Sequence, residues 1–255
     1  MCNEARQQGV HECKGIDHRG FIAIQETADA IYLTEEELFK IRALEFTPES
    51  VERMCRLKAE KNNLSESEAK LALRNTRMDV KIRSCEIVRA KFLIGAFTAL
   101  RVSDFNSLTP SNIRGDFMVV PIKKSGYTRK VTIPIHWVVR EILDSGFDIF
   151  VSISDQKINE HIKEICLLAG IADEIEITRN VGGKRIREIK EKWRLVTNHT
   201  ARRSAATNMY KSGIPSLAIM QITGHTTEKS FLKYIKVSAE ENAEILARHS
   251  FFAKL

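Results

Sequence analysis

Two histidines, two adjacent arginines and a C-terminal tyrosine occur in the segment "HTARRSAATNMYKSGIPSLAIMQITGHTTEKSFLKY", among mostly small, polar and apolar residues. His199 and Arg202 are three residues apart, so on a helix they share one face. His225 follows a glycine, and Tyr234 lies nine residues later. A guanidinium can hold two oxygens of a phosphate, and an imidazole can donate a hydrogen bond or move a proton. The set therefore suits chemistry on one anionic ligand.

Each of these residues also has an ordinary structural interpretation. A tyrosine near a helix end usually packs in the core with its hydroxyl bonded, and we interpret Tyr210 in that way. A histidine at a helix boundary is usually a capping or surface residue. These interpretations hold for each residue alone, but they explain the ordered set less well than a shared anionic target does.

Positive charge is concentrated in one part of the chain. The 255 residues include 40 basic and 33 acidic ones, which gives a net charge of +7. Between Arg179 and Arg203 there are nine basic and two acidic residues, a local excess of 9 − 2 = +7. This segment is either a solvated basic face or a surface that binds phosphates.

Composition excludes several other classes of protein. Apolar residues make up 43% of the chain and charged residues 29%, which is typical of a globular domain. No apolar run reaches the roughly 18 residues of a membrane-spanning helix, and the N-terminus lacks the apolar region of a signal peptide. The five scattered cysteines favour a reducing cytoplasm. Cys2, His11, Cys13 and His18 fit no common zinc finger, so we expect no metal and no cofactor.

Hydrophobic periodicity predicts a mainly helical α+β domain with one or two small hairpins. Residues 1–30 show no periodicity and are expected to be a leader or the remnant of an interdomain linker. The remaining residues, 31–255, are expected to form one domain. Helices are predicted over 33–44, 47–63, 64–75, about 80–100, 136–146 and 155–170, with shorter helices from 199 onward. Hairpins are predicted over 117–135 and 174–189, turning at Gly126 and at Gly182–Gly183.

Local signals mark several element boundaries. Capping boxes are predicted at Thr34 with Glu37 and at Ser65 with Glu68. Other boundary signals are Pro48 in a first turn, Gly146, Gly170 and Gly224 at helix ends, Gly213 and Pro215 between two helices, and Ser238 with Glu241 at the last helix. Tyr234 is expected on a short helix with Phe231 and Ile235 facing inward, and Trp193 is expected to pack rather than stack.

Taken in order, the motifs resemble the catalytic domain of the tyrosine recombinases, the phage-integrase family. "TALRVSD" resembles the first arginine motif and gives Arg101, "HTARRSAAT" gives His199 and Arg202, and "ITGHTTEKSFLKY" gives His225 and Tyr234. The family also places a lysine on a hairpin turn. In "KKSG" the match is Lys124, with Lys123 as its rival, and Asp104 matches an acidic residue after the first arginine. The resemblance extends from about Ile31 to the C-terminus.

The resemblance implies a metal- and ATP-independent strand transfer. Arg101 and Arg202 would neutralise the charge of the transition state, with a further hydrogen bond from His225. Tyr234 would attack phosphorus, His199 would accept its proton, and Lys124 would protonate the leaving 5′ oxygen. The product would be a 3′-phosphotyrosyl link with a free 5′ hydroxyl. Asp104 would orient an arginine.

Double-stranded DNA is the implied partner. The resemblance also implies that the protein is a monomer when free and a tetramer on paired DNA sites, and that it acts in the nucleoid region of a bacterial cytoplasm. The expected DNA contacts are Lys123, Arg129, Lys130, Arg179, Lys184, Arg185, Arg187 and Arg203. Residues 46–79 are interpreted as a helical insertion. The C-terminal helix within 238–255 would fold back on its own domain or dock on a neighbouring protomer. Two alternatives remain, a type IB topoisomerase-like enzyme and a DNA-binding module that does not cleave.

Overall fold

The structure is a computed structural model that describes residues 31–124, 127–181, 184–232, 234–235, 237, 239–247 and 252. The side chains of 123–128 and 179–185 lie outside this description. The chain divides into two units, which are treated separately. One comprises residues 30–176 and 189–255, and the described part of the other is residues 177–181 and 184–188. The predicted leader 1–30, with its candidate zinc ligands, therefore lies outside the described residues.

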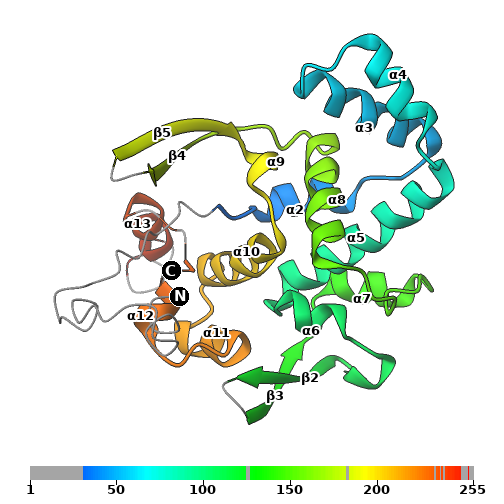
Figure 1. Ribbon diagram of the computed structural model, residues 1–255. Coiled ribbons are helices and arrows are strands. Elements are labelled where there is room, and N and C mark those ends of the chain that lie inside the picture. The colour runs from blue at the N-terminus through cyan, green and yellow to red at the C-terminus, as the bar shows by residue number, and fades with distance from the viewer. Residues whose placement is uncertain are drawn as a thin grey trace, which may run out of the picture. The chain divides into compact units, whose positions relative to one another are not determined.

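The described part of the chain is mainly helical with small antiparallel sheets, as the sequence predicts (Figure 1). The helices are α2 (Glu35–Arg42), α3 (Pro48–Lys61), α4 (Glu66–Arg74), α5 (Met78–Thr98), α6 (Val102–Asn106), α7 (Trp137–Asp144), α8 (Asp155–Leu168), α9 (Lys192–Leu195), α10 (Asn198–Lys211), α11 (Ser216–Thr223), α12 (Glu228–Leu232) and α13 (Ala239–Ala247). The strands are β1 (Ile113–Arg114), β2 (Phe117–Lys124), β3 (Tyr127–Pro134), β4 (Glu174–Val181) and β5 (Lys184–Glu191).

Helix α5 is the centre of the larger unit, and α2, α3, α7, α8 and α10 pack around it. Every residue from Ala90 to Thr98 is buried, which explains why this half of the helix is apolar on all sides except at Lys91 and Thr98. A Cβ on Gly95 would lie 2.9 Å from Cε1 of Phe105 and 3.3 Å from Cβ of Ala201. Glycine therefore lets α6 and α10 approach α5 closely, which brings together the elements that carry the two predicted catalytic arginines.

The predicted helix boundaries are largely confirmed. Thr34 and Ser65 form capping boxes with Glu37 and Glu68, and Pro48 begins α3. Gly146, Gly170, Gly213 and Gly224 adopt positive φ just beyond their helices, a conformation that favours glycine. The predicted cap at Ser238 lies outside the described residues.

The hairpin predicted over 117–135 is also confirmed. Strands β2 and β3 pair antiparallel from Phe117 with Pro134 to Lys124 with Tyr127. Buried Met118, Val120 and Ile122 alternate along β2, so one face of the sheet covers the core. The short strand β1 adds to the edge of β2 and was not predicted. The predicted turn at Gly126 lies outside the described residues.

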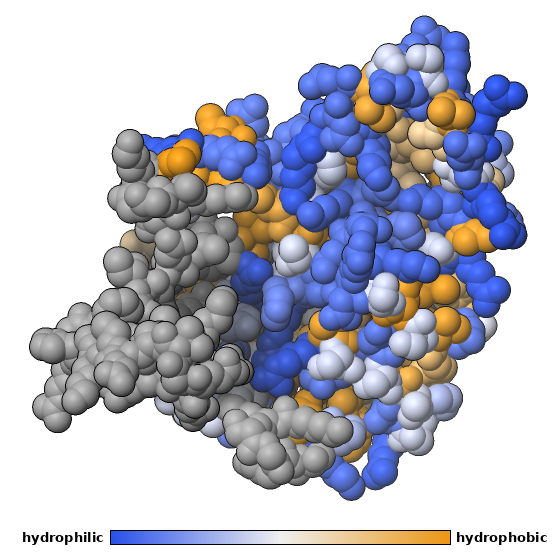
Figure 2. Space-filling model, in the orientation of Figure 1, coloured by the Kyte–Doolittle hydropathy of each residue, from blue (hydrophilic) through white to orange (hydrophobic). Residues whose placement is uncertain are grey.

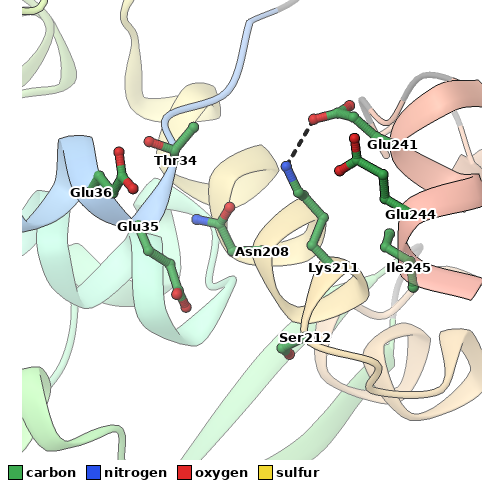
Figure 3. A pocket seen from close by; sticks show the side chains of 9 residues that line it. All are labelled: Thr34, Glu35, Glu36, Asn208, Lys211, Ser212, Glu241, Glu244 and Ile245. Atoms are coloured by element: carbon green, nitrogen blue, oxygen red, sulfur yellow. Dashed lines mark hydrogen bonds and ion pairs between the residues drawn. The ribbon is translucent and has the colours of Figure 1, made fainter. Parts of the chain in front are cut away.

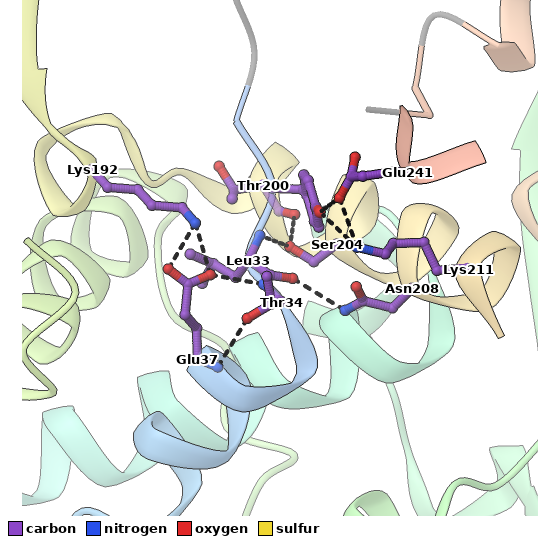
Figure 4. A network of polar contacts seen from close by, with 10 residues as sticks. Leu33, Thr34, Glu37, Lys192, Thr200, Ser204, Asn208, Lys211 and Glu241 are labelled. Carbon is purple, nitrogen blue, oxygen red and sulfur yellow. Dashed lines mark hydrogen bonds and ion pairs between the residues drawn. The ribbon is translucent and has the colours of Figure 1, made fainter. Parts of the chain in front are cut away.

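Residues 31–34, which precede α2, are held to α10 by hydrogen bonds (Figure 4). The backbone N–H of Leu33 donates to Oγ of Ser204 at 2.8 Å, and Nδ2 of Asn208 donates to the carbonyl of Leu33 at 3.1 Å. The Glu37 carboxylate accepts from Nζ of Lys192 at 2.7 Å with both oxygens. Helices α2, α9 and α10 are thereby held to one another.

An ion cluster around the buried carboxylate of Glu164 joins α3, α5 and α8. Glu164 on α8 accepts from Nζ of Lys58 on α3 at 2.5 Å and from Nζ of Lys81 on α5, and Nδ1 of His161 lies 3.5 Å from Oε2. Burial opposes the charged form of this carboxylate, but His161, Lys81 and Lys58 outweigh it and lower the pKa of Glu164 to about 2. The cluster anchors α3, which lies within the predicted insertion 46–79.

Glu164→Gln is expected to lower the free energy of unfolding by about 3 kcal/mol at pH 7, because it leaves two lysines without their charged partner. The folded pKa lies below the ordinary value of 4.5, so this stabilisation is present above about pH 4.5 and is lost as the pH falls toward 2. Urea unfolding at pH 7 and pH 3 measures both effects. Glu160→Gln on the exposed side of α8 is the control, and an equal loss in both variants contradicts the prediction.

Candidate active site

Arg202 on α10 is the most buried member of the predicted catalytic set, with 3% of the residue exposed. Its Nη1 donates to the carbonyl of Ala99 at 2.5 Å, and its Nη2 donates to the carbonyl of Thr223. The guanidinium therefore joins α10 to the ends of α5 and α11. Its Nε is buried and has no hydrogen-bond partner among the described residues. Such a donor is available to an anionic ligand.

Arg101 and Asp104 lie on the short helix α6 beside Arg202. Arg101 is the N-terminal cap residue of α6 and is half-buried. Burial and the charge of Arg101 lower the pKa of Arg202 to about 10, while Tyr234 and Asp104 act in the opposite direction. Arg202 therefore stays charged at neutral pH. Oδ2 of Asp104 is buried and lacks a partner in the described part of the chain, so Asp104 can still accept a bond.

His225 and Tyr234 lie against each other next to Arg202. Their ring centroids are 4.6 Å apart with an angle of 57° between the rings. Cζ of Arg202 lies 5.9 Å from the centroid of the Tyr234 ring. Nδ1 of His225 lies 2.8 Å from Oγ1 of Thr223, which orients the imidazole. Arg202, His225 and Tyr234 of one chain therefore form one cluster, as their sequence motifs predict.

The prediction that Tyr234 lies on a helix is wrong. Helix α12 ends at Leu232, and Tyr234 lies in the turn that follows. Its backbone N–H donates to the carbonyl of Phe231, three residues back, at 2.7 Å. Phe231 is buried and Ile235 half-buried, which matches the inward direction expected for both. Turn residues have fewer backbone restraints than helix interiors, so the tyrosine is held chiefly by its neighbours.

His199 lies in the first turn of α10, on the same helix as Arg202, as their three-residue spacing predicts. Burial and the charges of Arg203, Arg202 and Arg101 lower its pKa below the ordinary 6.5, and Asp155 opposes them. The imidazole is therefore neutral at pH 7 and can accept a proton. Surface exposure of the residue leaves it accessible to a ligand.

For the DNA cleavage that the family resemblance implies, the acid limb of the rate is expected below pH 6.5, because the neutral imidazole of His199 persists to lower pH than usual. Arg203→Gln removes the charge that lowers this pKa most, so it should move the limb upward toward 6.5. Single-turnover cleavage at saturating DNA between pH 5 and 8 tests the shift. Lys130→Gln, a charge loss on β3, is the matched control. A limb that stays in place in Arg203→Gln contradicts the role of His199.

For the two predicted lysines, Lys123 and Lys124, the structure describes the backbone position but not the side chain. Lys124 is the last residue of β2 and pairs with Tyr127, next to the hairpin turn, while Lys123 pairs with Thr128. Their side chains lie outside the description, so the choice between them stays a prediction. Gly224 has a positive φ of 69°, and a Cβ on it would lie 3.1 Å from Cδ1 of Ile122. This close approach places the turn before His225 against the same strand.

The predicted DNA contacts are partly engaged within the protein. Arg129 and Lys130 are both exposed, and Arg129 donates to Oε1 of Gln221, which joins β3 to α11. Arg203 is half-buried and donates to the carbonyl of His199 at 3.4 Å. Trp193 is 4% exposed, so the packing interpretation is confirmed.

Strands β4 and β5 form the second predicted hairpin and carry the remaining predicted contacts. Arg187 is exposed, and the side chains of Arg179, Lys184 and Arg185 lie outside the description, as does the turn at 182–183. Ile186 and Ile189 expose 49% and 66% of their surface, and apolar residues are visible over β5 in Figure 2. The hairpin surface is therefore mixed rather than purely basic.

Sequence reasoning missed Thr223. Its carbonyl accepts from Arg202, and its hydroxyl lies against His225, so it connects two members of the site. The available signal was its position directly before the Gly-His pair.

Among the described residues, no group of three or more histidine, cysteine or acidic side chains could hold a metal ion. Within the same residues, no helix has the length and apolar character needed to cross a membrane.

Comparison with known proteins identifies the family of this chain. The sequence profile of the phage integrase family matches residues 62–241, more than half of the chain. A lambda integrase dimer bound to a COC′ core site is 16% identical, with a TM-score of 0.54 over 92% of this chain and 55% of that chain.

Two further structures are similar at lower scores. XerH bound to palindromic difH is 15% identical with a TM-score of 0.48 over 85% of this chain, which spans about half (52%) of the XerH chain. The catalytic domain of bacteriophage HP1 integrase is 17% identical with a TM-score of 0.43, over 89% of this chain and 100% of that domain. No curated protein sequence matches this chain. The lambda integrase comparison agrees with the helical fold, and the profile match identifies the protein as a member of the phage integrase family.

Proposed function

We propose that the chain is the catalytic domain of a site-specific DNA recombinase, in which Tyr234 forms a 3′-phosphotyrosyl link. The observation that carries this proposal is the contact of the Tyr234 ring with His225 and its position beside the buried guanidinium of Arg202. Because all three belong to one chain, the tyrosine would attack the phosphate held by its own arginines. Such a protein works where the DNA lies, which for a bacterial chain is the cytoplasm that contains the nucleoid.

The roles follow from charge and position. Arg101 and Arg202 neutralise the phosphate oxygens, and Nε of Arg202 is a donor still available for one of them. His225 contributes a further hydrogen bond to a phosphate oxygen, with its Nδ1 held against Oγ1 of Thr223. Neutral His199 takes the proton of Tyr234, and Lys124 at the end of β2 gives a proton to the 5′ oxygen that leaves.

The test is a nicked suicide DNA that carries candidate sites, incubated with native protein and with Tyr234→Phe. An SDS-resistant protein–DNA band that only the native protein forms supports the proposal. Salt-sensitive binding without a band supports a module that does not cleave, and no binding rejects the DNA proposal. No described contact favours the topoisomerase-like alternative over recombination.

We also propose that the protein is a monomer when free and a tetramer on paired DNA sites. Helix α13 lies against its own domain, but none of its residues is buried. It is held by polar contacts: Glu241 with Nζ of Lys211 at 2.8 Å, and Asn242 with the hydroxyl of Tyr210 at 3.1 Å. A polar cavity of about 520 Å³ lies between α2, α10 and α13 (Figure 3). A helix held in this way can exchange to a neighbouring protomer.

Removal of residues 238–255 is expected to prevent tetramer formation on paired sites while a single protomer still binds one site. Sedimentation of the free protein and of its complexes with one or two sites measures both. Lys211→Ala, which removes only one contact of α13, should leave the tetramer intact. A truncated protein that assembles as well as the native one contradicts the role of this helix.

A further inference from the structure

A lysine is buried in the apolar core of the larger unit. Lys91 on α5 has 1% of its surface exposed, and its neighbours along the helix are also buried. Its Nζ donates to the carbonyl of Asn106 at 3.5 Å, the one hydrogen bond that it makes among the described residues. Burial lowers its pKa to about 8, and Asp148 is the charged group that opposes this shift. An ammonium in such a place is unfavourable unless a polar group needs it.

The polar group that Lys91 contacts is a carbonyl at the C-terminal end of α6. This helix has five residues, so it makes few internal hydrogen bonds and depends on its surroundings. Its last carbonyl, that of Asn106, points to Lys91, and the hydroxyl of Ser107 caps the carbonyl of Ser103 at 2.7 Å. The Asn106 side chain in turn bonds both backbone groups of Ile153, at 2.7 Å and 3.3 Å.

The same face of α5 fixes α6 at a second point. Gly95, one turn after Lys91, lies against the ring of Phe105, and the ring would clash with any Cβ there. Helix α6 is therefore held at its middle by packing and at its C-terminal end by the lysine. Its N-terminal end is Arg101, and Asp104 lies in its first turn.

We propose that Lys91 is a positioning residue that holds α6 and thereby sets Arg101 and Asp104 against Arg202. An apolar side chain would fill this place at lower energetic cost but would leave the carbonyl of Asn106 without a donor. The inference rests on the proposed strand cleavage for its functional part, whereas the hold on α6 is a structural statement that is tested separately.

The experiment compares Lys91→Met with Lys81→Met, the same substitution ten residues earlier on α5. Amide hydrogen exchange of residues 102–107, the melting temperature, DNA affinity and single-turnover cleavage of suicide DNA are measured. Lys91→Met should melt no lower than the native protein, since it removes a buried charge. Its α6 amides should exchange about tenfold faster, and its cleavage should slow about tenfold at unchanged DNA affinity, as for the loss of one charged hydrogen bond. Lys81→Met should melt lower because Glu164 loses a partner, with α6 exchange and cleavage unchanged.

Lys91→Gln keeps an N–H donor and should retain more α6 protection and faster cleavage than Lys91→Met. If Lys91→Met does not fold, Lys91→Gln is compared with the native protein in the same measurements. Unchanged α6 exchange in Lys91→Met overturns the proposal, and so does unchanged cleavage with faster exchange, or equal behaviour of the two variants. If the native protein does not cleave DNA, the proposed function fails, and the exchange data still decide whether Lys91 holds α6.

Discussion

Tyr234→Phe is expected to abolish covalent complex formation with DNA while the protein stays folded and bound. The substitution removes only the hydroxyl. The ring contact with His225 and the backbone bond to Phe231 do not involve that oxygen. Loss of a nucleophile typically lowers the rate by about 10⁶, which would bring the product below detection on a gel. The measurement is the rate of formation of the SDS-resistant band at saturating DNA.

Tyr210→Phe is the matched control for this result. It also removes one hydroxyl, which bonds Oδ1 of Asn242 on α13, and it lies on the same helix as Arg202. It should cleave at the native rate and lose about 1 kcal/mol of stability. Cleavage by Tyr234→Phe at a rate similar to that of Tyr210→Phe would show that another group attacks the phosphate.

Arg202→Lys is expected to slow cleavage by about 10²–10³ even though the charge is kept, as for loss of an anion-stabilising donor. A lysine is a single donor point and cannot reach the carbonyls of Ala99 and Thr223 while it also faces a phosphate. One buried carbonyl would lose its partner, so the free energy of unfolding should fall by about 2 kcal/mol. Single-turnover kinetics and urea unfolding measure the two effects.

Arg203→Lys is the matched control, because it makes the same substitution at a neighbouring arginine outside the proposed catalytic set. Arg203 is half-buried, and its Nε donates a long hydrogen bond of 3.4 Å to the carbonyl of His199. Its replacement should leave stability within about 0.5 kcal/mol and cleavage within tenfold at pH 7. If Arg202→Lys also cleaves within tenfold of the native protein, the guanidinium is not the centre of the site.

Local chemistry made much of the fold predictable. The capping box of Thr34 and the glycine after α8 act within a few residues, so they can be identified from sequence alone. Helix α6, strand β1 and helix α9 have five, two and four residues, too few to show a period, and were missed. Tyr234 was assigned to a helix because its apolar neighbours have helical spacing, but α12 ends two residues earlier.

The candidate site was predictable as a set of residues but not as a set of contacts. The spacing of His199 and Arg202 places both on α10, as predicted. The bonds of Arg202 to Ala99 and Thr223 join residues 103 and 21 positions away, and no local pattern contains that information. The same holds for Lys91, whose burial depends on how α6 returns to α5. The bond of Arg129 to Gln221 shows that a basic residue on a hairpin can have a partner within the protein.

Identification of the amino acid that becomes linked to DNA tests the central claim most directly. The native protein is trapped on suicide DNA, digested with nuclease and protease, and analysed by mass spectrometry. The chain has four tyrosines, so the assignment has clear alternatives. We predict a nucleotide adduct, joined through a 3′ phosphate, on the peptide that contains Tyr234. An adduct on Tyr32, Tyr127 or Tyr210, or DNA cleavage with no adduct, would contradict the proposed mechanism.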